Sequence, residues 1–415
     1  MCASEMLPID EGHQRAMRAG MLADTLRARQ HEVTWWTSAF NHSTKRLRCD
    51  HTSTVTLGNG TRLKLLFGRA YRRNVCLARL LNHYQLALEF ARQSAKEITP
   101  DLILCCWPTI ELAAACVRYA EKHNIPVVLD VRDLWPDILL DVIPRSVRWV
   151  AKWVSLPYSR MTRKAFERCT AIVGISENYL NWGLGYAGRP RKEFDAVFPL
   201  GYQEPVLPPA VVEAERSYLQ ALGVDDSRTI CWFLGSFGQT YDLEPIIHAA
   251  RELQQLGESR FQFVFSGDGE KRRAWQELAR GLRNVVFTGW LDAARIAAMM
   301  RMSRIGLAAY RKGAPQGLPN KIFEYLAGGL PILSCLTGEC EQFLRSAGCG
   351  SQYVAGDSRS FLEELLKLTS SEKYRSRIAM KCLHAFRTQY SASRVYPALA
   401  CHLERLAGCA SSTPA

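Results

Sequence analysis

Short runs of β-branched and aromatic residues alternate with segments of helical periodicity along the whole chain. Five runs lie in the first half: "EVTWWTS", "DLILCCW", "VVLDV", "AIVGIS" and "DAVFPLG". Five more follow in the second half: "TICWFLG", "FQFVFSGDG", "VVFTGW", "IGLAAY" and "PILSC". This alternation is typical of parallel β-α-β units.

The proline-bearing stretch "GYQEPVLPPAV" (201–211) separates the two series and is the predicted hinge. We therefore predict an α/β protein with two doubly wound domains, residues 1–203 and 204–392. A final helix, within a terminal segment 393–415, is expected to pack back across the hinge. Ligands of such sheets bind beyond the carboxyl ends of the strands, so we expect the site in a cleft between the two domains.

Composition narrows the class of protein. The chain has 415 residues, of which 47% are hydrophobic and 22% charged, as in globular proteins. It contains no run of about 18 apolar residues, and its first residues lack the basic and apolar pattern of a secretory signal. The fourteen cysteines are scattered, without a C-x-x-C pair or a histidine cluster. We predict a cytoplasmic protein with reduced thiols and no metal.

Positive charge is concentrated in the first half, where residues 1–200 hold 28 Lys and Arg against 19 Asp and Glu. Two segments dominate it, "RLKLLFGRAYRR" (62–73) and "RSVRWVAKWVSLPYSRMTRKAFER" (145–168). In the second, Trp149 and Trp153 recur at helical spacing beside Arg148 and Lys152, which favours a helix in a membrane interface. The alternative is a solvated basic helix whose tryptophans pack into the core. We expect no nucleic-acid partner.

Three strand ends in the second half carry small residues that suit an anion site. Gly235 and Gly238 follow one strand, Gly267 begins the loop after the next, and "TGW" with Gly289 ends a third. Glycine lets backbone N–H groups approach a ligand and point at a negative charge. Together these strand ends predict a nucleotide site.

The stretch "GLPNKIFEYLAGG" (317–329) predicts a helix with Pro319 at its first position. Its positive dipole end would face the loop before it and attract an anion. Lys321 and Glu324 share one face with Tyr325, and Glu324 would lie about 7 Å below the helix start. That distance matches the span from a nucleotide's diphosphate to its ribose. A carboxylate can accept hydrogen bonds from the two ribose hydroxyls. The alternative is a surface Lys321–Glu324 pair of small energetic value.

At this point the chain resembles a family. "PNKIFEYLAGGLPIL", with "VVFTGW" and "SGDG", is similar to the donor half of retaining glycosyltransferases of family four, which have the GT-B fold. "EGHQRAMRAGMLADTLRARQHEVTWWTSAFNHSTKR" and "VLDVRDLWPD" resemble the subgroup that builds bacterial O-antigen, capsule and exopolysaccharide chains. The resemblance implies two Rossmann-like domains facing a cleft, and a hexosyltransferase that takes its sugar from a nucleotide-diphosphate sugar.

The resemblance also implies roles for residues of the second half. Glu324 would bind the ribose as the second glutamate of the E-x7-E motif. Gln316 stands where the first glutamate would contact the donor sugar, so the identity of that sugar stays open. The remaining donor-site residues would hold the diphosphate or frame the base: Asn320, Lys321, Gly235, Ser236, Gly267, Gly289 and Trp290.

In the first half the resemblance implies an acceptor site. Asp133 would position hydroxyl groups, Arg132 would pair with phosphate or serve the structure, and Gly12 would lie beside the reacting sugar. A local salt bridge between Arg132 and Asp133 is the alternative. These enzymes generally need no metal, and the departing diphosphate takes the acceptor's proton.

One departure from the family concerns the first domain. Its members usually begin with a strand ahead of the "LPIDEG" equivalent, whereas "MCASEM" stands there in this sequence. That strand would be central in the sheet, so its absence predicts a gap in the core and an unpaired neighbour.

The sequence thus favours a glycosyltransferase peripheral to the cytoplasmic face of the inner membrane, acting on a polyprenyl-diphosphate-linked saccharide. Two alternatives remain open. One is a catalytically weak, nucleotide-sugar-binding partner of a polysaccharide assembly complex. The other is a GT-B fold sugar-nucleotide epimerase.

Overall fold

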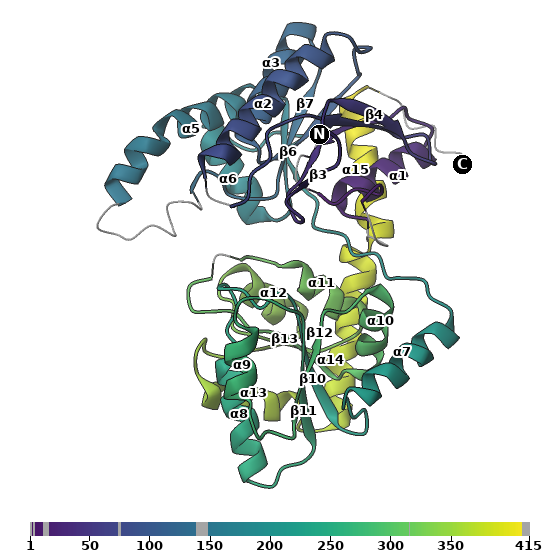
Figure 1. The fold of residues 1–415 in the computed structure, drawn as a ribbon, viewed down its shortest axis with the longest axis vertical. Coiled ribbons are helices and arrows are strands. Elements are labelled where there is room, and N and C mark those ends of the chain that lie inside the picture. Colours follow the sequence, from purple (N-terminus) through teal and green to yellow (C-terminus); the bar gives the residue numbers. More distant parts are fainter. Residues whose placement is uncertain are drawn as a thin grey trace. The chain divides into compact units, whose positions relative to one another are not determined.

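A computed structural model describes residues 2, 5–10, 16–73, 76–137, 148–314 and 316–408. The chain divides into two compact units (Figure 1). Unit 1 comprises Met1–Leu200 and Val395–Ala415, and unit 2 comprises Gly201–Arg394. The divisions fall within three residues of the predicted boundaries after residues 203 and 392.

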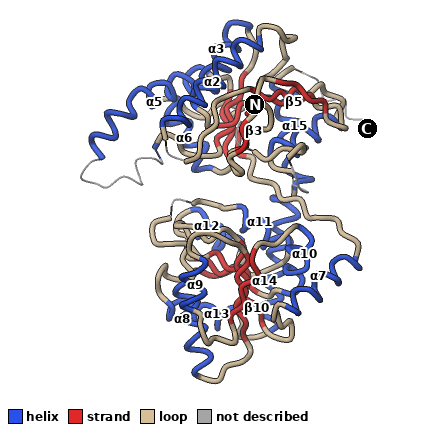
Figure 2. The backbone as a smooth tube through the Cα atoms, viewed as in Figure 1, coloured by secondary structure: helices blue, strands red, loops and turns tan. Residues whose placement is uncertain are grey.

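Unit 1 alternates strands and helices through most of its length (Figure 2). Its helices are α1 (Arg18–Ala28), α2 (Leu77–Ser94), α3 (Ile110–His123), α5 (Arg148–Arg168) and α6 (Glu177–Ala187). Its strands are β1 (Thr34–Ser38), β2 (Phe40–Asn41), β3 (Arg46–Leu47), β4 (Ser53–Thr56), β5 (Arg62–Leu66), β6 (Ile103–Trp107), β7 (Val127–Val131), β8 (Ala171–Gly174) and β9 (Ala196–Val197).

The main strands of unit 1 form two separate sheets. One has the order β1-β5-β4, with β1 and β5 parallel and β4 antiparallel to β5. The other has the order β6-β7-β8-β9 and is parallel throughout. Among the described residues no strand joins β1 to β6. The predicted gap and unpaired neighbour in the first domain stay predictions.

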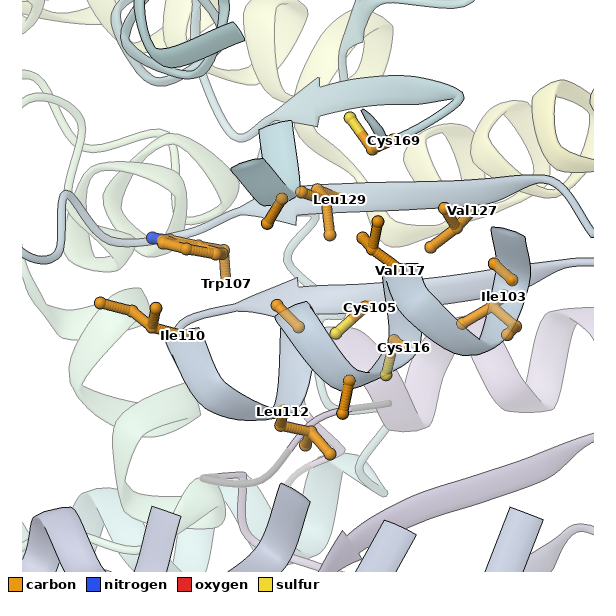
Figure 3. Close-up of a cluster of buried hydrophobic side chains, with 14 of the residues drawn as sticks. Ile103, Cys105, Trp107, Ile110, Leu112, Cys116, Val117, Val127, Leu129 and Cys169 are labelled. Carbon is orange, nitrogen blue, oxygen red and sulfur yellow. The ribbon is translucent and has the colours of Figure 1, made fainter. Parts of the chain in front are cut away.

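The larger sheet of unit 1 is buried because helices cover it. Strand β7 is buried at all five positions, and the inward side of α3 packs against β6 and β7. Figure 3 shows this packing, with Ile110, Cys116 and Val117 beside the two strands. Continuous apolar strands of this kind are typical of parallel sheets.

Unit 2 has one parallel sheet of order β12-β11-β10-β13-β14-β15. Its strands are β10 (Thr229–Leu234), β11 (Phe261–Ser266), β12 (Val285–Gly289), β13 (Ile305–Ala308), β14 (Ile332–Ser334) and β15 (Gly350–Gln352). Its helices are α7 (Pro209–Ala221), α8 (Glu244–Gln255), α9 (Arg272–Leu278), α10 (Ala293–Met302), α11 (Asn320–Ala327), α12 (Glu339–Ala347), α13 (Ser358–Leu368) and α14 (Glu372–Ala385), followed by a π-helical turn (Phe386–Tyr390).

All ten predicted strand runs contain a strand. The prediction missed β2 to β5, which are short or strongly polar, and β15, which is only three residues long. The last helix, α15 (Ala392–Leu406), starts at the end of unit 2, and its residues from Val395 onward belong to unit 1. There Glu404 accepts hydrogen bonds from Arg29 at 2.6 Å, which fixes the helix within unit 1.

Candidate nucleotide-diphosphate site

The glycines predicted at three strand ends of unit 2 lie together. Gly235 follows β10, Gly267 follows β11 and Gly289 ends β12. The N–H of Gly235 donates to the carbonyl of Ser266 at 3.0 Å, and the N–H of Gly267 donates to the carbonyl of Gly289 at 2.8 Å. The three loops therefore form one continuous edge at the carboxyl end of the sheet, where ligands of such sheets bind.

The close approach of these loops requires glycine at position 267. A Cβ there would lie 1.8 Å from the carbonyl oxygen of Gly235, and the φ of +145° is one that other residues rarely adopt. A Cβ on Gly235 would lie 3.0 Å from the Lys321 Nζ. The glycines thus bring the loop after β10 against the lysine.

Lys321 lies in the first turn of α11 and is 6% exposed. Its ammonium group is 4.0 Å from the ring centroids of both Phe233 and Tyr241, and 5.0 Å from that of Tyr310. Among the described residues its Nζ has no hydrogen-bond partner. A buried donor of this kind is costly unless a ligand satisfies it.

The electrostatics of Lys321 favour the arrival of an anion. Burial lowers the pKa of its ammonium group well below the usual range, and the nearby Glu324 carboxylate opposes part of that shift. The faces of the three aromatic rings partly compensate the buried charge. A phosphate at Gly235 would supply the missing counter-charge and favour the protonated form.

The other residues predicted on α11 differ in burial. Glu324 is half-buried one turn beyond Lys321. Burial is the main cause that raises the pKa of the Tyr241 hydroxyl, and the nearby Glu324 carboxylate raises it further. Asn320 is exposed, and the half-buried Gln316 has a side-chain oxygen without a partner among the described residues. Lys321 and Glu324 do not form the surface pair that was the alternative, because Lys321 is buried.

Two details of the predicted helix are wrong. Pro319 is extended and precedes α11, so the first helical residue is Asn320. Tyr325, predicted on the ligand face, is fully buried: its hydroxyl donates to the Leu307 carbonyl and accepts from the Leu234 N–H, both at 3.0 Å. The tyrosine therefore ties α11 to two strands of the sheet.

The remaining donor-site predictions lie at the surface. Ser236 is exposed in the loop after β10, and Trp290, directly after β12, is 73% exposed. Sequence reasoning missed Tyr241 and Tyr310, whose rings lie 4.8 Å apart beside the lysine. Their position just beyond strand ends, in "SFGQTYD" and "LAAYRK", was the available signal.

The acceptor-side predictions in unit 1 have a different outcome. The Arg132 guanidinium donates to Asp130 at 2.7 Å and also contacts the Glu5 carboxylate. The predicted alternative, a local salt bridge between Arg132 and Asp133, is therefore wrong, because Arg132 pairs with these other carboxylates. Asp133 accepts a hydrogen bond from the Leu134 N–H at 2.8 Å, and burial raises the pKa of its carboxyl group. Gly12 lies outside the described residues.

Asp130 organises this part of unit 1 and was not predicted. It is fully buried, and Arg18 donates to both of its oxygens, at 3.0 and 3.1 Å. Burial alone would raise its pKa, but Arg18 and Arg132 hold the pKa at about 2. A charged residue inside the otherwise apolar run "VVLDV" was the signal in the sequence.

The two basic segments of unit 1 are built differently. Within the first, Arg62 and Lys64 pair with Glu97, so part of its charge serves the structure. Within the second, Trp149 and Trp153 on α5 are 66% and 71% exposed, so the alternative that they pack into the core is wrong. Among the described residues no helix is long and apolar enough to span a bilayer.

Part of unit 2 is similar to a known protein family. Residues 228–371, inside unit 2, match the family described as Glycosyl transferases group 1. No curated protein matches the sequence. The family match confirms that unit 2 resembles a glycosyltransferase domain.

Similar solved structures cover nearly the whole chain. Sucrose-phosphate synthase from Thermosynechococcus elongatus has a TM-score of 0.69 at 12% identity, over 94% of this chain and 93% of its own. HepE from Anabaena, solved with UDP, has 0.66 at 12%, over 93% and 95%. WaaG, a glycosyltransferase involved in lipopolysaccharide biosynthesis, has 0.61 at 17%, over 97% and 98%. The GT-B fold is thereby confirmed.

Proposed function

We propose that this protein, whose residues 228–371 form a group 1 glycosyltransferase domain, transfers a sugar from a nucleotide-diphosphate sugar to a saccharide acceptor. The observation that carries the proposal is Lys321, a buried ammonium group that faces a glycine-rich loop and has no hydrogen-bond partner among the residues that the structure describes. HepE has been solved with UDP and with UDP-glucose, which makes uridine donors the first to test here.

In this proposal the donor lies along α11. The diphosphate binds between Lys321 and the loop at Gly235, where the first-turn N–H groups of the helix add positive potential. Glu324, one turn further, accepts hydrogen bonds from the ribose hydroxyls. Gln316 contacts the sugar, while Gly289 and Trp290 frame the base. No metal ion is required in this scheme.

The chemical step breaks the bond between the anomeric carbon and the diphosphate oxygen. The diphosphate leaves with the electron pair, the acceptor hydroxyl oxygen bonds to the anomeric carbon, and the departing diphosphate takes the hydroxyl proton. Attack on the face that the diphosphate leaves retains the configuration. Lys321 stabilises the charge that develops on the leaving group, which is where preorganised charge contributes most.

For the acceptor we propose a lipid-linked saccharide at a membrane surface. Exposed Trp149 and Trp153, on a helix with a basic composition, suit the interface of an anionic bilayer on the cytoplasmic side. Asp133, two residues beyond the end of β7, would position acceptor hydroxyls. WaaG, similar in fold, is described as involved in lipopolysaccharide biosynthesis, which supports a role in surface polysaccharide synthesis.

Two assays test the proposal against its alternatives. Isothermal titration with UDP and UDP-sugars measures donor binding, and release of UDP on adding a lipid-linked saccharide measures transfer. Binding without release would instead support the catalytically weak partner. Conversion of the UDP-sugar without any acceptor would support the epimerase. Absence of binding to any nucleotide sugar would refute the donor site.

Sedimentation with phosphatidylglycerol vesicles tests the membrane surface. The double variant Trp149→Ser, Trp153→Ser should lose most of its vesicle binding, because both indoles leave the interface. Leu256→Ser is the matched control, since Leu256 is 73% exposed in unit 2. Equal sedimentation of both variants and the wild type would contradict membrane docking through α5.

A further inference from the structure

Side chains from three segments of unit 1 meet at Tyr71: the turn between β2 and β3, the loop after β5 and the first half of α2. The His42 Nδ1 lies 2.6 Å from the Tyr71 hydroxyl, and the Lys45 Nζ lies 3.4 Å from the same nitrogen. The Lys45 Nζ is 5.1 Å from the centroid of the Tyr71 ring, and the Arg79 Cζ is 6.0 Å from it. We call His42, Lys45, Tyr71 and Arg79 the basic cluster.

The turn between β2 and β3 fixes the position of Lys45. The Asn41 side-chain oxygen accepts hydrogen bonds from the N–H groups of Ser43 and Thr44, at 2.9 and 3.1 Å. The Asn41 carbonyl accepts a further one from the Lys45 N–H at 2.9 Å. Lys45 has a φ of +58°, a left-handed conformation that is uncommon for residues other than glycine. Backbone strain of this kind persists only where the surrounding structure enforces it, and it is concentrated at functional sites.

Buried groups on α2 and α3 hold Arg79 in the cluster. The Arg79 Nε donates to the His83 Nε2 at 3.4 Å. In its neutral form the His83 ring therefore carries its proton on Nδ1, which lies 3.7 Å from the Glu111 carboxylate. Both His83 and Glu111 are buried. The Arg79 guanidinium also lies 4.7 Å from the centroid of the Trp135 ring, so a histidine and an aromatic ring fix its position.

The charges around His42 are positive. Burial is the main cause that lowers the pKa of His42 to about 4, and Lys45, Arg79 and His83 add to this effect. Burial also lowers the pKa of Lys45, and Arg79 lowers it further. In the part of the chain that the structure describes, no carboxylate contributes to either shift. Asp133 is near Arg79, which lowers the pKa of this carboxyl group, but burial outweighs that effect and raises it.

We propose that the basic cluster is a recessed binding site for a phosphate group. Lys45 can only donate a hydrogen bond, so the His42 Nδ1 accepts and the neutral ring carries its proton on Nε2. The Lys45 ammonium, the Arg79 guanidinium and this N–H are all donors, the groups that phosphate oxygens bind. All three side chains are half-buried, which strengthens such contacts relative to an exposed surface.

The phosphate belongs to the acceptor, and this assignment rests on the proposed function. Two sources share the required chemistry: the diphosphate of a lipid-linked saccharide and the phosphate of a phosphorylated sugar. The position of the cluster agrees with an acceptor role, because Trp135 beside Arg79 lies in the same loop after β7 as Asp133.

The test measures phosphate binding by calorimetry in the Lys321→Met variant, in which the donor site lacks its cation. The probes are inorganic pyrophosphate, farnesyl diphosphate and glucose 6-phosphate. Lys45→Gln and Arg79→Gln, added singly, each remove one charge of the basic cluster. Arg92→Gln is the matched control, because Arg92 lies on the same helix as Arg79 and its side chain is 74% exposed.

Each cluster variant should weaken pyrophosphate binding at least about tenfold, because it loses a charge-assisted contact, while the control keeps its affinity. Tighter binding of farnesyl diphosphate than of glucose 6-phosphate would assign the site to a lipid-linked diphosphate, and the reverse order would assign it to a phosphorylated sugar. Equal pyrophosphate affinity of the cluster variants and the control would overturn the proposal. Titration of the wild type with UDP decides the proposed function separately, since the donor lies in unit 2.

NMR titration of the His42 ring gives a second measurement that needs no substitution in the cluster. Excess pyrophosphate should raise the pKa of His42 from about 4, because a bound anion favours the protonated ring beside Lys45, Arg79 and His83. A His42 pKa that stays unchanged in excess pyrophosphate would also overturn the proposal.

Discussion

Replacing Lys321 by methionine separates the function of the lysine from its place in the fold. Methionine keeps most of the side-chain volume and removes the charge. The folded variant without ligand should be as stable as the wild type or slightly more stable, because a buried ammonium group with no hydrogen-bond partner in the described part of the chain is exchanged for an apolar group. Turnover should fall about 100- to 1000-fold, since a preorganised charge at a leaving group contributes roughly 3–4 kcal/mol to the transition state.

The pH dependence of donor binding gives a second readout for the same variant. Burial lowers the pKa of Lys321, and a bound diphosphate would raise it, so binding takes up a proton at pH values where the free lysine is neutral and the bound lysine is protonated. Affinity for UDP should therefore decrease as the pH rises through the lowered pKa of the free enzyme. The methionine variant should show neither the proton uptake nor this part of the pH dependence. Titrations in two buffers of different ionisation enthalpy measure both.

Lys64→Met is the matched control. Lys64 is also 6% exposed and lies 5.0 Å from the Trp36 ring centroid, but it is paired with Glu97. Its replacement should lower the free energy of unfolding and leave turnover of the folded enzyme unchanged. Equal turnover of Lys321→Met and wild type, or a loss of stability equal to that of the control, would refute the leaving-group role.

Three further predictions concern other residues. Glu324→Ala should weaken the binding of both UMP and UDP about tenfold in calorimetry, because it removes the ribose contact; unchanged dissociation constants would reject that contact. Gly267→Ala should lower the free energy of unfolding by roughly 3 kcal/mol in urea titrations, since its Cβ would overlap the Gly235 carbonyl. Gly257→Ala, with open space around it, should cost clearly less. The pKa of Asp130 is lowered to about 2, so its contribution of about 2 kcal/mol to stability is present above pH 4 and is lost as the pH falls toward 2. Asp130→Asn should remove this acid dependence, and an unchanged slope would contradict it.

Much of the fold was predictable because it depends on local patterns. Most apolar runs of the parallel sheets, such as Val127–Val131, are buried as their composition requires. Strand β5 was missed because a strand with Arg62 and Lys64 looks like a basic surface segment. Burial of Lys64 depends on Glu97, which is 33 residues away and cannot be inferred from local sequence.

The candidate site, too, was predicted only where its residues give a local signal. Gly235, Gly267 and Lys321 were predicted from glycine positions at strand ends and from a helix start, which are local signals. The aromatic rings around Lys321 were not predicted, because Phe233, Tyr241 and Tyr310 come from different loops and strands. Only the sheet order brings them to one point.

A crystal structure of the full chain with UDP tests the central claim most directly. We predict a phosphate oxygen within about 2.9 Å of the Lys321 Nζ, beside Gly235, and the Glu324 carboxylate on the ribose hydroxyls. A nucleotide bound elsewhere, or a Lys321 side chain that stays within its aromatic rings without contacting the diphosphate, would contradict the account.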